Sequence, residues 1–159
     1  MLEEKMRRWL WILRHLRRSG VDAADLLFVY KSILRPVLDF AAPTYHAMLN
    51  KVLSNRLEAL QRRAMKIIYG TERSYDDIIE KCNIERLDNR REEIFVRFAK
   101  KAAASANFGT KWFPKKLPTA HNTRFPDYYI EERARTTRMK KNPISYMRQE
   151  LNKQNRSAL

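Results

Sequence analysis

The sequence is poor in glycine and in the alternation typical of β-strands. Three glycines occur in 159 residues, and few stretches alternate β-branched with polar side chains. Tight turns between strands favour glycine and strands favour β-branched residues, so both shortages argue against a sheet protein. A chain of this length can bury a real core. We expect an all-α fold: a small helical bundle of about five helices with an irregular basic C-terminal arm.

Cysteine pairs and long apolar runs are also missing. Cys82 is the single cysteine, which excludes an internal disulfide and fits a reducing compartment. No apolar run reaches the roughly 18 residues of a membrane span. The first residues place acids ahead of their apolar part and offer no small-residue cleavage site, unlike a secretory signal. We therefore expect an intracellular protein without a transmembrane segment, in the nucleus or the cytoplasm.

Acidic residues are scarce relative to basic ones. The chain has 33 Lys and Arg against 18 Asp and Glu, which leaves a formal net charge of +15 at pH 7. Such an excess favours a polyanionic partner, with nucleic acid as the first expectation and an anionic membrane surface as the second. A merely solvated basic surface is the third interpretation.

Apolar side chains that recur every three or four residues predict the helices. The expected ranges are 3–18, 22–40, 54–70, 74–82 and 88–109. The stripe of the second range is the most apolar and should be buried: Leu26, Leu27, Tyr30, Ile33, Leu34, Val37 and Leu38. In the third range the apolar stripe consists of Leu57, Leu60, Ala64, Ile67 and Ile68, and basic residues surround it.

Capping residues and prolines set the expected ends of these helices. Asp22 is the expected N-cap of the second helix, and Pro36 should kink that helix because it lacks a backbone donor. Pro43 should end it, with the preceding residue, Ala42, pushed toward an extended conformation. Ser54 is the expected N-cap of the third helix, and Gly70 would stop it.

Cations on three segments form the predicted nucleic-acid contacts. At about 100° per residue, Arg56, Arg63 and Lys66 lie largely opposite the apolar stripe of the third helix, with Arg62 at its flank. Such a row can follow a phosphate backbone without reading bases. The other predicted contacts are Arg97, Lys100 and Lys101 on the fifth helix and Arg138, Lys140 and Lys141 in the C-terminal part. A solvated helical face is the alternative interpretation.

Two tryptophans near the N-terminus permit two interpretations. Trp9 and Trp11 lie among basic residues, and aromatic rings between cations suit stacking on unpaired bases. Tryptophans at this spacing more often pack into a core. Packing is the interpretation that we favour from the sequence.

No catalytic, metal or cofactor site is predicted. Tyr45 and His46 have no nucleophile or carboxylate at a supporting spacing, so we expect them to pack where the chain turns. Asp76 and Asp77 open a short helix, as capping and dipole-compensating acids do. Adjacent residues also diverge by about 100° on a helix, so the two carboxylates would not converge on an ion.

The character of the chain changes after residue 109. Four prolines interrupt the last fifty residues, where twelve basic residues face four acidic ones. We expect a helical thumb-like domain over 1–109 and a partly irregular basic extension over 110–159. Short helical pieces are expected near 128–139 and 145–153, and aromatic residues should dock parts of the extension on the core.

The central stretch, VYKSILRPVLDFAAPTYHAML followed by LSNRLEALQRRAMKIIYG, resembles the region after the polymerase palm in reverse transcriptases of non-LTR retrotransposons of the LINE-like jockey and CR1 group. The residues that carry the resemblance are Tyr30, Arg35, Pro36, Leu38, Ala42, Pro43, His46, Leu57, Gln61, Arg63, Ala64, Ile67 and Ile68. The segment RMKKNPISYMRQELNK is similar to the common ending of these reading frames. The resemblance spans nearly the whole chain.

The resemblance implies the thumb and C-terminal extension of such an enzyme, which would grip RNA or an RNA–DNA hybrid beside the palm. The family's catalytic motif, Phe or Tyr followed by Ala-Asp-Asp, does not occur here. Without the palm aspartates two catalytic metals have no site, so we expect no polymerase activity from this chain alone. A separate palm would then be a partner.

Two other functions remain open from the sequence. The chain could be an inert or structural helical remnant whose basic face binds little. It could also be an amphipathic helical protein that binds a partner or a membrane surface. Apolar surface left uncovered on the first two helices would favour the last interpretation.

Overall fold

The computed structural model describes residues 2–116, 128–131 and 135–157, and the chain is all-α, as the sequence predicts. Residue contacts divide it into two units, which we describe separately. Unit 1 consists of Met1–Phe40 and Leu49–Arg91, and unit 2 of Ala41–Met48 and Glu92–Leu159. In the described part of the chain the β pairing is limited to an isolated bridge between Lys115 and Tyr129.

The division by contacts differs from the boundary expected after residue 109. It falls within α7 (Leu87–Ala104), between Arg91 and Glu92. The later residues of α7 share a core with the C-terminal helix, which assigns them to unit 2. The short segment Ala41–Met48 joins the same unit.

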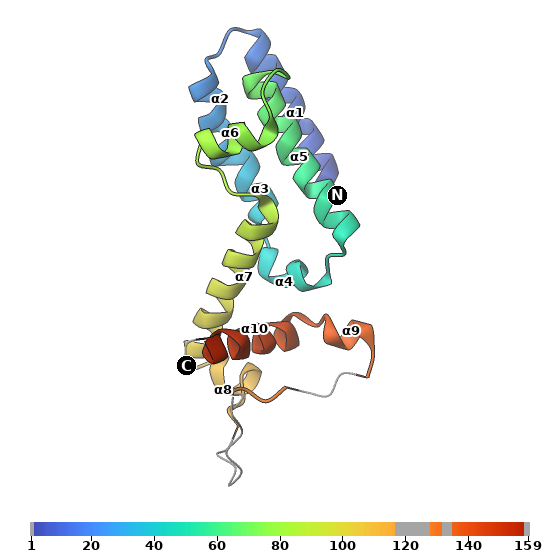
Figure 1. Cartoon of the computed structure of the whole chain (residues 1–159), viewed down its shortest axis with the longest axis vertical. Helices are drawn as coiled ribbons and strands as arrows, with labels where there is room; N and C mark the ends of the chain where they lie inside the picture. The colour runs from blue at the N-terminus through green and yellow to red at the C-terminus, as the bar shows by residue number, and fades with distance from the viewer. Residues whose placement is uncertain (1, 117–127, 132–134, 158–159) are drawn as a thin grey trace. The chain divides into compact units, whose positions relative to one another are not determined.

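Unit 1 is built on an up-down-up arrangement of helices (Figure 1). Its elements are α1 (Leu2–Arg18), α2 (Ala23–Val29), the π-helical segment η1 (Tyr30–Leu34), α3 (Arg35–Asp39), α5 (Lys51–Tyr69) and α6 (Tyr75–Lys81). α1 and α5 run in the same direction and pack on each other, and the α2–η1–α3 helix runs opposite to both. Met6, Leu10 and Leu13 of α1 are fully or almost fully buried, as their spacing predicts.

The second helix is continuous from Ala23 to Asp39, but one turn of it is wide. The Asp22 carboxylate accepts a hydrogen bond from the Ala24 backbone N–H at 3.2 Å, so the predicted cap is confirmed. In η1 the Arg35 N–H bonds to the carbonyl of Tyr30, five residues earlier. Pro36 cannot donate to the preceding turn, and a π-turn accommodates the missing bond. The irregularity expected at Pro36 thus lies in the turn before it.

One expected helix start is wrong by about one turn, whereas the second helix ends at Asp39, one residue from its expected end. α5 begins after Asn50, whose side chain accepts from the Leu53 N–H at 2.8 Å, one turn before the expected cap Ser54. Gly70 does end α5, with a φ of 88° that favours glycine. Pro43 does not end the second helix, because that helix stops at Asp39 and Ala42 begins α4 (Ala42–Tyr45). Proline is tolerated in a first turn, where its missing donor is not needed.

A buried polar network holds α5 to its neighbours. The Tyr30 hydroxyl donates to Gln61 Oε1 at 2.6 Å, and Gln61 Nε2 donates to the Tyr75 hydroxyl at 2.9 Å and to the Glu85 carbonyl at 3.0 Å. Tyr75 in turn donates to Glu58, whose other oxygen accepts from the Leu87 N–H at 2.9 Å. Gln61 is completely buried. A satisfied buried amide fixes the orientation of a helix more strictly than apolar packing alone.

Two arginines near the start of α7 are engaged inside unit 1. Arg91 is 2% exposed and donates to the Ser54 hydroxyl at 2.6 Å. Arg90 is half-buried between Asp39 and Glu85, at 3.5 and 3.8 Å. Burial raises the pKa of the Asp39 carboxyl, and Arg90 and Arg35 oppose that shift. These cations are structural, because carboxylates and a hydroxyl of unit 1 already engage them.

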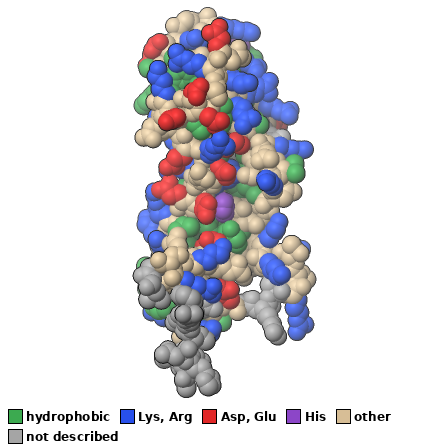
Figure 2. Space-filling model, in the orientation of Figure 1, with side chains coloured by type: hydrophobic (Ala, Val, Ile, Leu, Met, Phe, Trp, Pro, Cys, Tyr) green, Lys and Arg blue, Asp and Glu red, His purple; other side chains and the backbone are tan. Residues whose placement is uncertain are grey.

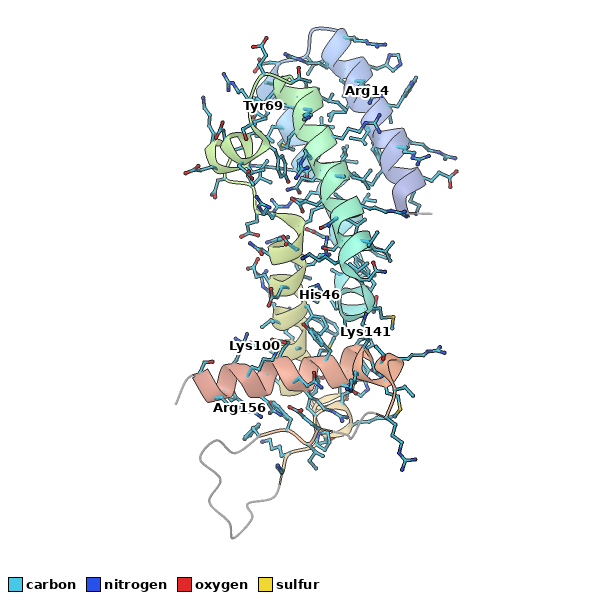
Figure 3. The ribbon with its side chains drawn as sticks, turned by 45° about the vertical axis from the view of Figure 1, so that its right-hand side comes forward. Arg14, His46, Tyr69, Lys100, Lys141 and Arg156 are labelled. Carbon is cyan, nitrogen blue, oxygen red and sulfur yellow. The ribbon has the colours of Figure 1, made fainter. Side chains whose placement is uncertain are left out.

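Unit 2 contains α4, the 3-10 segment η2 (His46–Met48), most of α7, α8 (Gly109–Trp112), α9 (Thr137–Lys140) and α10 (Pro143–Ser157). Its core joins Phe95, Ala99 and Ala102 of α7 to Phe113, Met147 and Leu151. The His46 ring packs 5.2 Å from Phe95 and 6.2 Å from Tyr146, which agrees with the expected packing role (Figure 3). A side chain at Gly109 would lie 2.6 Å from the Ala103 carbonyl, so this turn requires glycine.

The irregular basic arm expected after residue 109 is not confirmed over the residues that the structure describes. α10 is a 15-residue helix, longer than the piece expected near 145–153, and it buries Met147 and Leu151 at four-residue spacing. The helix expected near 128–139 is wrong over 128–131, where the backbone pairs with 114–116, and it is limited to α9 further on. Residues 117–127 and 132–134 lie outside the described part of the chain.

Replacing Tyr30 by Phe should destabilise the protein by about 1–3 kcal/mol, because Gln61 Oε1 would stay buried without its donor. Urea unfolding of the full chain, followed by circular dichroism, measures the change. Tyr69→Phe is the matched control. Among the described residues the Tyr69 hydroxyl accepts a hydrogen bond only from the half-buried Cys82 thiol, at 3.1 Å, so we expect a change within about 0.5 kcal/mol. Equal losses in both variants would contradict the network.

Stability should fall above pH 10. Burial raises the pKa of Tyr30, and burial with a bond to Glu58 raises that of Tyr75. In the unfolded chain both phenols ionise near pH 10, so their contribution is complete below that pH and is lost above it. Each group should contribute a slope of about 1.4 kcal/mol per pH unit. Between pH 10 and 11.5 the unfolding free energy of Tyr30→Phe should therefore fall less steeply with pH than that of the unaltered chain, by about 1.4 kcal/mol per pH unit. An unchanged slope would contradict the raised pKa of Tyr30.

Candidate nucleic-acid interface

The four cations predicted on α5 all lie at the surface. Arg56, Arg62, Arg63 and Lys66 are exposed. The opposite side of the helix is buried and consists of Leu57, Gln61, Ala64, Met65 and Ile68. Two residues of the predicted apolar stripe, Leu60 and Ile67, are half-buried instead. The network at Gln61 sets this rotation, so the structure brings the four cations together on one outward face.

Three of these cations form no ion pair with the described residues. Arg56, Arg63 and Lys66 lack a salt bridge there, and Arg62 lies 5.0 Å from the centre of the Tyr75 ring. Elsewhere exposed cations do find carboxylates: Arg86 pairs with Asp76 at 2.6 Å. Glu58 is the one acid of α5, and its two oxygens are already bonded to Tyr75 and to the Leu87 N–H. The cations of α5 therefore remain available to an external anion.

Helix α1 extends this positive surface with cations that were not among the predicted nucleic-acid contacts. Six basic residues and no acid occur between residues 5 and 18: Lys5, Arg7, Arg8, Arg14, Arg17 and Arg18. Because α1 packs on α5, their charges add. Figure 2 shows Lys and Arg side chains gathered along the right-hand edge of unit 1, over α1 and α5. We call the exposed cations of these two helices the basic surface.

Trp11 lies in the basic surface and is not a core residue. It is 60% exposed, and its ring meets that of His15 edge-on with the centroids 4.0 Å apart. Together with Arg7, Arg8 and Ile12 it lines a shallow hollow. The packing interpretation is therefore wrong for Trp11, although Trp9 is half-buried. The signal was available in the sequence: at about 100° per residue Trp11 lies about 130° from the middle of the stripe of Met6, Leu10 and Leu13, whereas Trp9 lies about 70° from it.

The other six predicted contacts belong to unit 2 and do not form one row. Arg97, Lys100 and Lys101 are exposed on α7, where Arg97 pairs with Glu93. Arg138 and Lys140 are on the short α9, and Lys141 follows it; all three are exposed. α9 adjoins α10. The structure therefore supports a continuous cationic row on α5 and separate cations in unit 2.

The described residues hold no cluster of three or more His, Cys, Asp or Glu side chains that could bind a metal ion. Asp76 is instead engaged by Arg86. Across the same residues, no helix combines the length and the apolar character that crossing a membrane demands.

Comparisons with protein-family models, with curated proteins and with solved structures found no match to this chain. The class of protein that the structure itself defines is an all-α protein with a basic helical surface. The relationship to reverse transcriptases stays a prediction from the sequence.

The basic surface should contribute little to stability. Replacing Arg56, Arg63 and Lys66 by Ala should change the free energy of unfolding by no more than about 0.5 kcal/mol per site, because exposed residues without partners have small effects. Arg91→Ala should cost about 1.5–3 kcal/mol, since it removes a buried charged hydrogen bond. Urea unfolding compares the variants. A large loss at the three surface positions would show that these side chains have structural partners.

Proposed function

We propose that this chain binds nucleic acid without sequence specificity, through the basic surface of α1 and α5. The observation that carries the proposal is the row of exposed cations on α5, of which Arg56, Arg63 and Lys66 have no carboxylate partner among the described residues. An unpaired cation gains more from a phosphate than one that must first leave a carboxylate. The single acid of α5 is bound inside the fold and does not weaken the row.

The geometry of the row suits contacts to a phosphate backbone. Arg56 and Arg63 are seven residues apart, so they lie about 10.5 Å apart along the helix axis and on nearly the same side. Lys66 follows one turn later. Contacts to phosphates position a nucleic acid but carry no sequence information. Binding should release counterions and weaken steeply with salt.

The resemblance to reverse transcriptases of non-LTR retrotransposons suggests where a chain with this function would come from. We propose that the chain is a thumb-like fragment of a retrotransposon RNA-directed DNA polymerase without its catalytic palm, and that RNA or an RNA–DNA hybrid is the partner. Gripping any template requires a surface that ignores sequence, which the basic surface provides. A polymerase palm is then a further partner, and the chain alone is not an enzyme. An inert remnant of the same origin is the alternative that binding experiments decide.

A second function, binding of a membrane surface or an apolar partner, is favoured by one observation. Phe28 and Phe40 of unit 1 are 70% and 77% exposed. Exposed aromatic residues near cations are typical of interfacial helices. Cosedimentation with anionic vesicles, in competition with RNA, distinguishes the two functions.

Binding of the full chain to an RNA–DNA hybrid should depend strongly on salt. With about four to six phosphate contacts, a plot of log K against log salt should have a slope of roughly −0.9 per contact on duplex DNA, and we expect a similar order on the hybrid. The variant with Arg56, Arg63 and Lys66 all changed to Ala should bind more weakly, with a slope smaller by about 2–3. Fluorescence anisotropy over roughly 50 to 300 mM salt measures both the affinity and its salt slope.

The control variant removes the same charge from another part of unit 1. Lys31, Arg73 and Lys81 are exposed and lie outside α1 and α5, so their joint change to Ala should leave the slope almost unchanged. If both triple variants lost the same affinity and slope, the net charge of the chain, and not the position of the cations on α5, would explain the binding. If the affinity of the unaltered chain for the hybrid did not change with salt, the proposal would be rejected and the inert remnant would be the remaining interpretation.

A further inference from the structure

Unit 2 contains an open cavity of about 410 Å³, within the usual size range of small-molecule sites. Its walls come from α7, from the chain around Lys115 and Tyr128, and from the C-terminal half of α10. Ala103 and Leu151 supply apolar wall, and Lys100, Gln154 and Asn155 supply polar groups. In Figure 3 Lys100 lies over the end of α10 that carries Arg156.

Hydrogen bonds hold the aromatic side of the cavity in place. The Tyr129 N–H donates to Asn152 Oδ1 at 2.9 Å, and Asn152 Nδ2 donates back to the Tyr129 carbonyl at 3.0 Å. The Lys116 N–H donates to the Tyr128 carbonyl at 2.9 Å. Asn152 is almost completely buried. The backbone that presents Tyr128 is thus fixed on both sides, as a preformed site requires.

Charge and aromatic surface meet at this wall. Lys115 Nζ lies 5.2 Å from the centre of the Tyr128 ring, and Tyr128 remains 45% exposed. A hydrogen bond to the Tyr128 hydroxyl raises the pKa of Lys115, so this lysine stays protonated. Lys100 adds a second cation from α7. Two ammonium groups can hold a phosphate, and a tyrosine ring can stack on a base.

One polar atom beside the cavity lacks a partner. Gln154 Oε1 is buried and accepts no hydrogen bond within the described residues. An unsatisfied buried acceptor is costly, and a donor from a ligand would satisfy it. The exocyclic amino group of adenine or cytosine is such a donor, whereas uracil has a carbonyl at the corresponding position.

We propose that this cavity binds a nucleoside monophosphate unit with an amino-bearing base. The base stacks on Tyr128 and donates to Gln154, and the phosphate lies between Lys100 and Lys115. The unit is either a free mononucleotide or a residue of a single-stranded nucleic acid. The site is separate from the basic surface and does not depend on the proposed function of α1 and α5.

Calorimetric titration of the full chain with AMP tests the proposal. AMP should bind, and adenosine, inorganic phosphate and UMP should each bind at least about tenfold more weakly, because adenosine lacks the phosphate, UMP lacks the amino donor and inorganic phosphate lacks both contacts of the base. Tyr128→Leu should weaken AMP binding about tenfold, and Gln154→Leu should abolish the preference for AMP over UMP. A 5′-phosphorylated oligoadenylate that binds much more tightly than AMP would identify a strand as the source, and equal affinities would identify the free nucleotide.

The controls keep the test specific. Lys115→Ala should weaken AMP binding, whereas Lys111→Ala, which removes an exposed lysine that does not line the cavity, should not. Circular dichroism confirms that each variant is folded. The variant of Arg56, Arg63 and Lys66 should bind AMP normally. No binding of AMP, equal binding of phosphate, or loss of AMP binding in the α5 variant would overturn the proposal.

Discussion

The buried amide of Gln61 is the constraint on which unit 1 depends. An amide in an apolar interior must find partners, and this one bonds to Tyr30, Tyr75 and the Glu85 carbonyl, which come from three different parts of the chain. Glu58 extends the network to the start of α7. Since every group must be satisfied at once, α5 has one rotation and one register against its neighbours.

That rotation also decides which side of α5 reaches solvent. With Gln61, Leu57 and Ile68 turned inward, Arg56, Arg63 and Lys66 must face outward. Among the described residues these three cations have no carboxylate partner, and Asp76 and Glu85 engage other arginines. The stability of the network and the proposed binding of phosphates are thus two consequences of one helix orientation, and they can be measured independently.

In unit 2, too, buried polar side chains with hydrogen-bond partners fix how the elements are arranged. Asn152 and Arg148 are buried on α10 and bind backbone groups of the chain near Tyr129 and Trp112. These bonds attach an irregular segment to a helix, and beside the attachment lies a cavity lined by Gln154, whose amide oxygen is unsatisfied within the described residues. A polar side chain that is satisfied by backbone groups therefore builds the wall, and one that is not satisfied marks where a ligand would fit.

The sequence by itself determined the helices, because apolar spacing and local caps depend on near neighbours: Asp22 caps α2, Gly70 ends α5, and Met6, Leu10 and Leu13 are buried. It also placed the four cations of α5 on one face. Only the tertiary structure decided that Arg91 is buried, that Trp11 is exposed, and that the C-terminal residues form α10 on the core of unit 2. Periodicity gives the direction of a side chain, but whether that direction meets solvent, a carboxylate or another helix depends on segments distant in the chain.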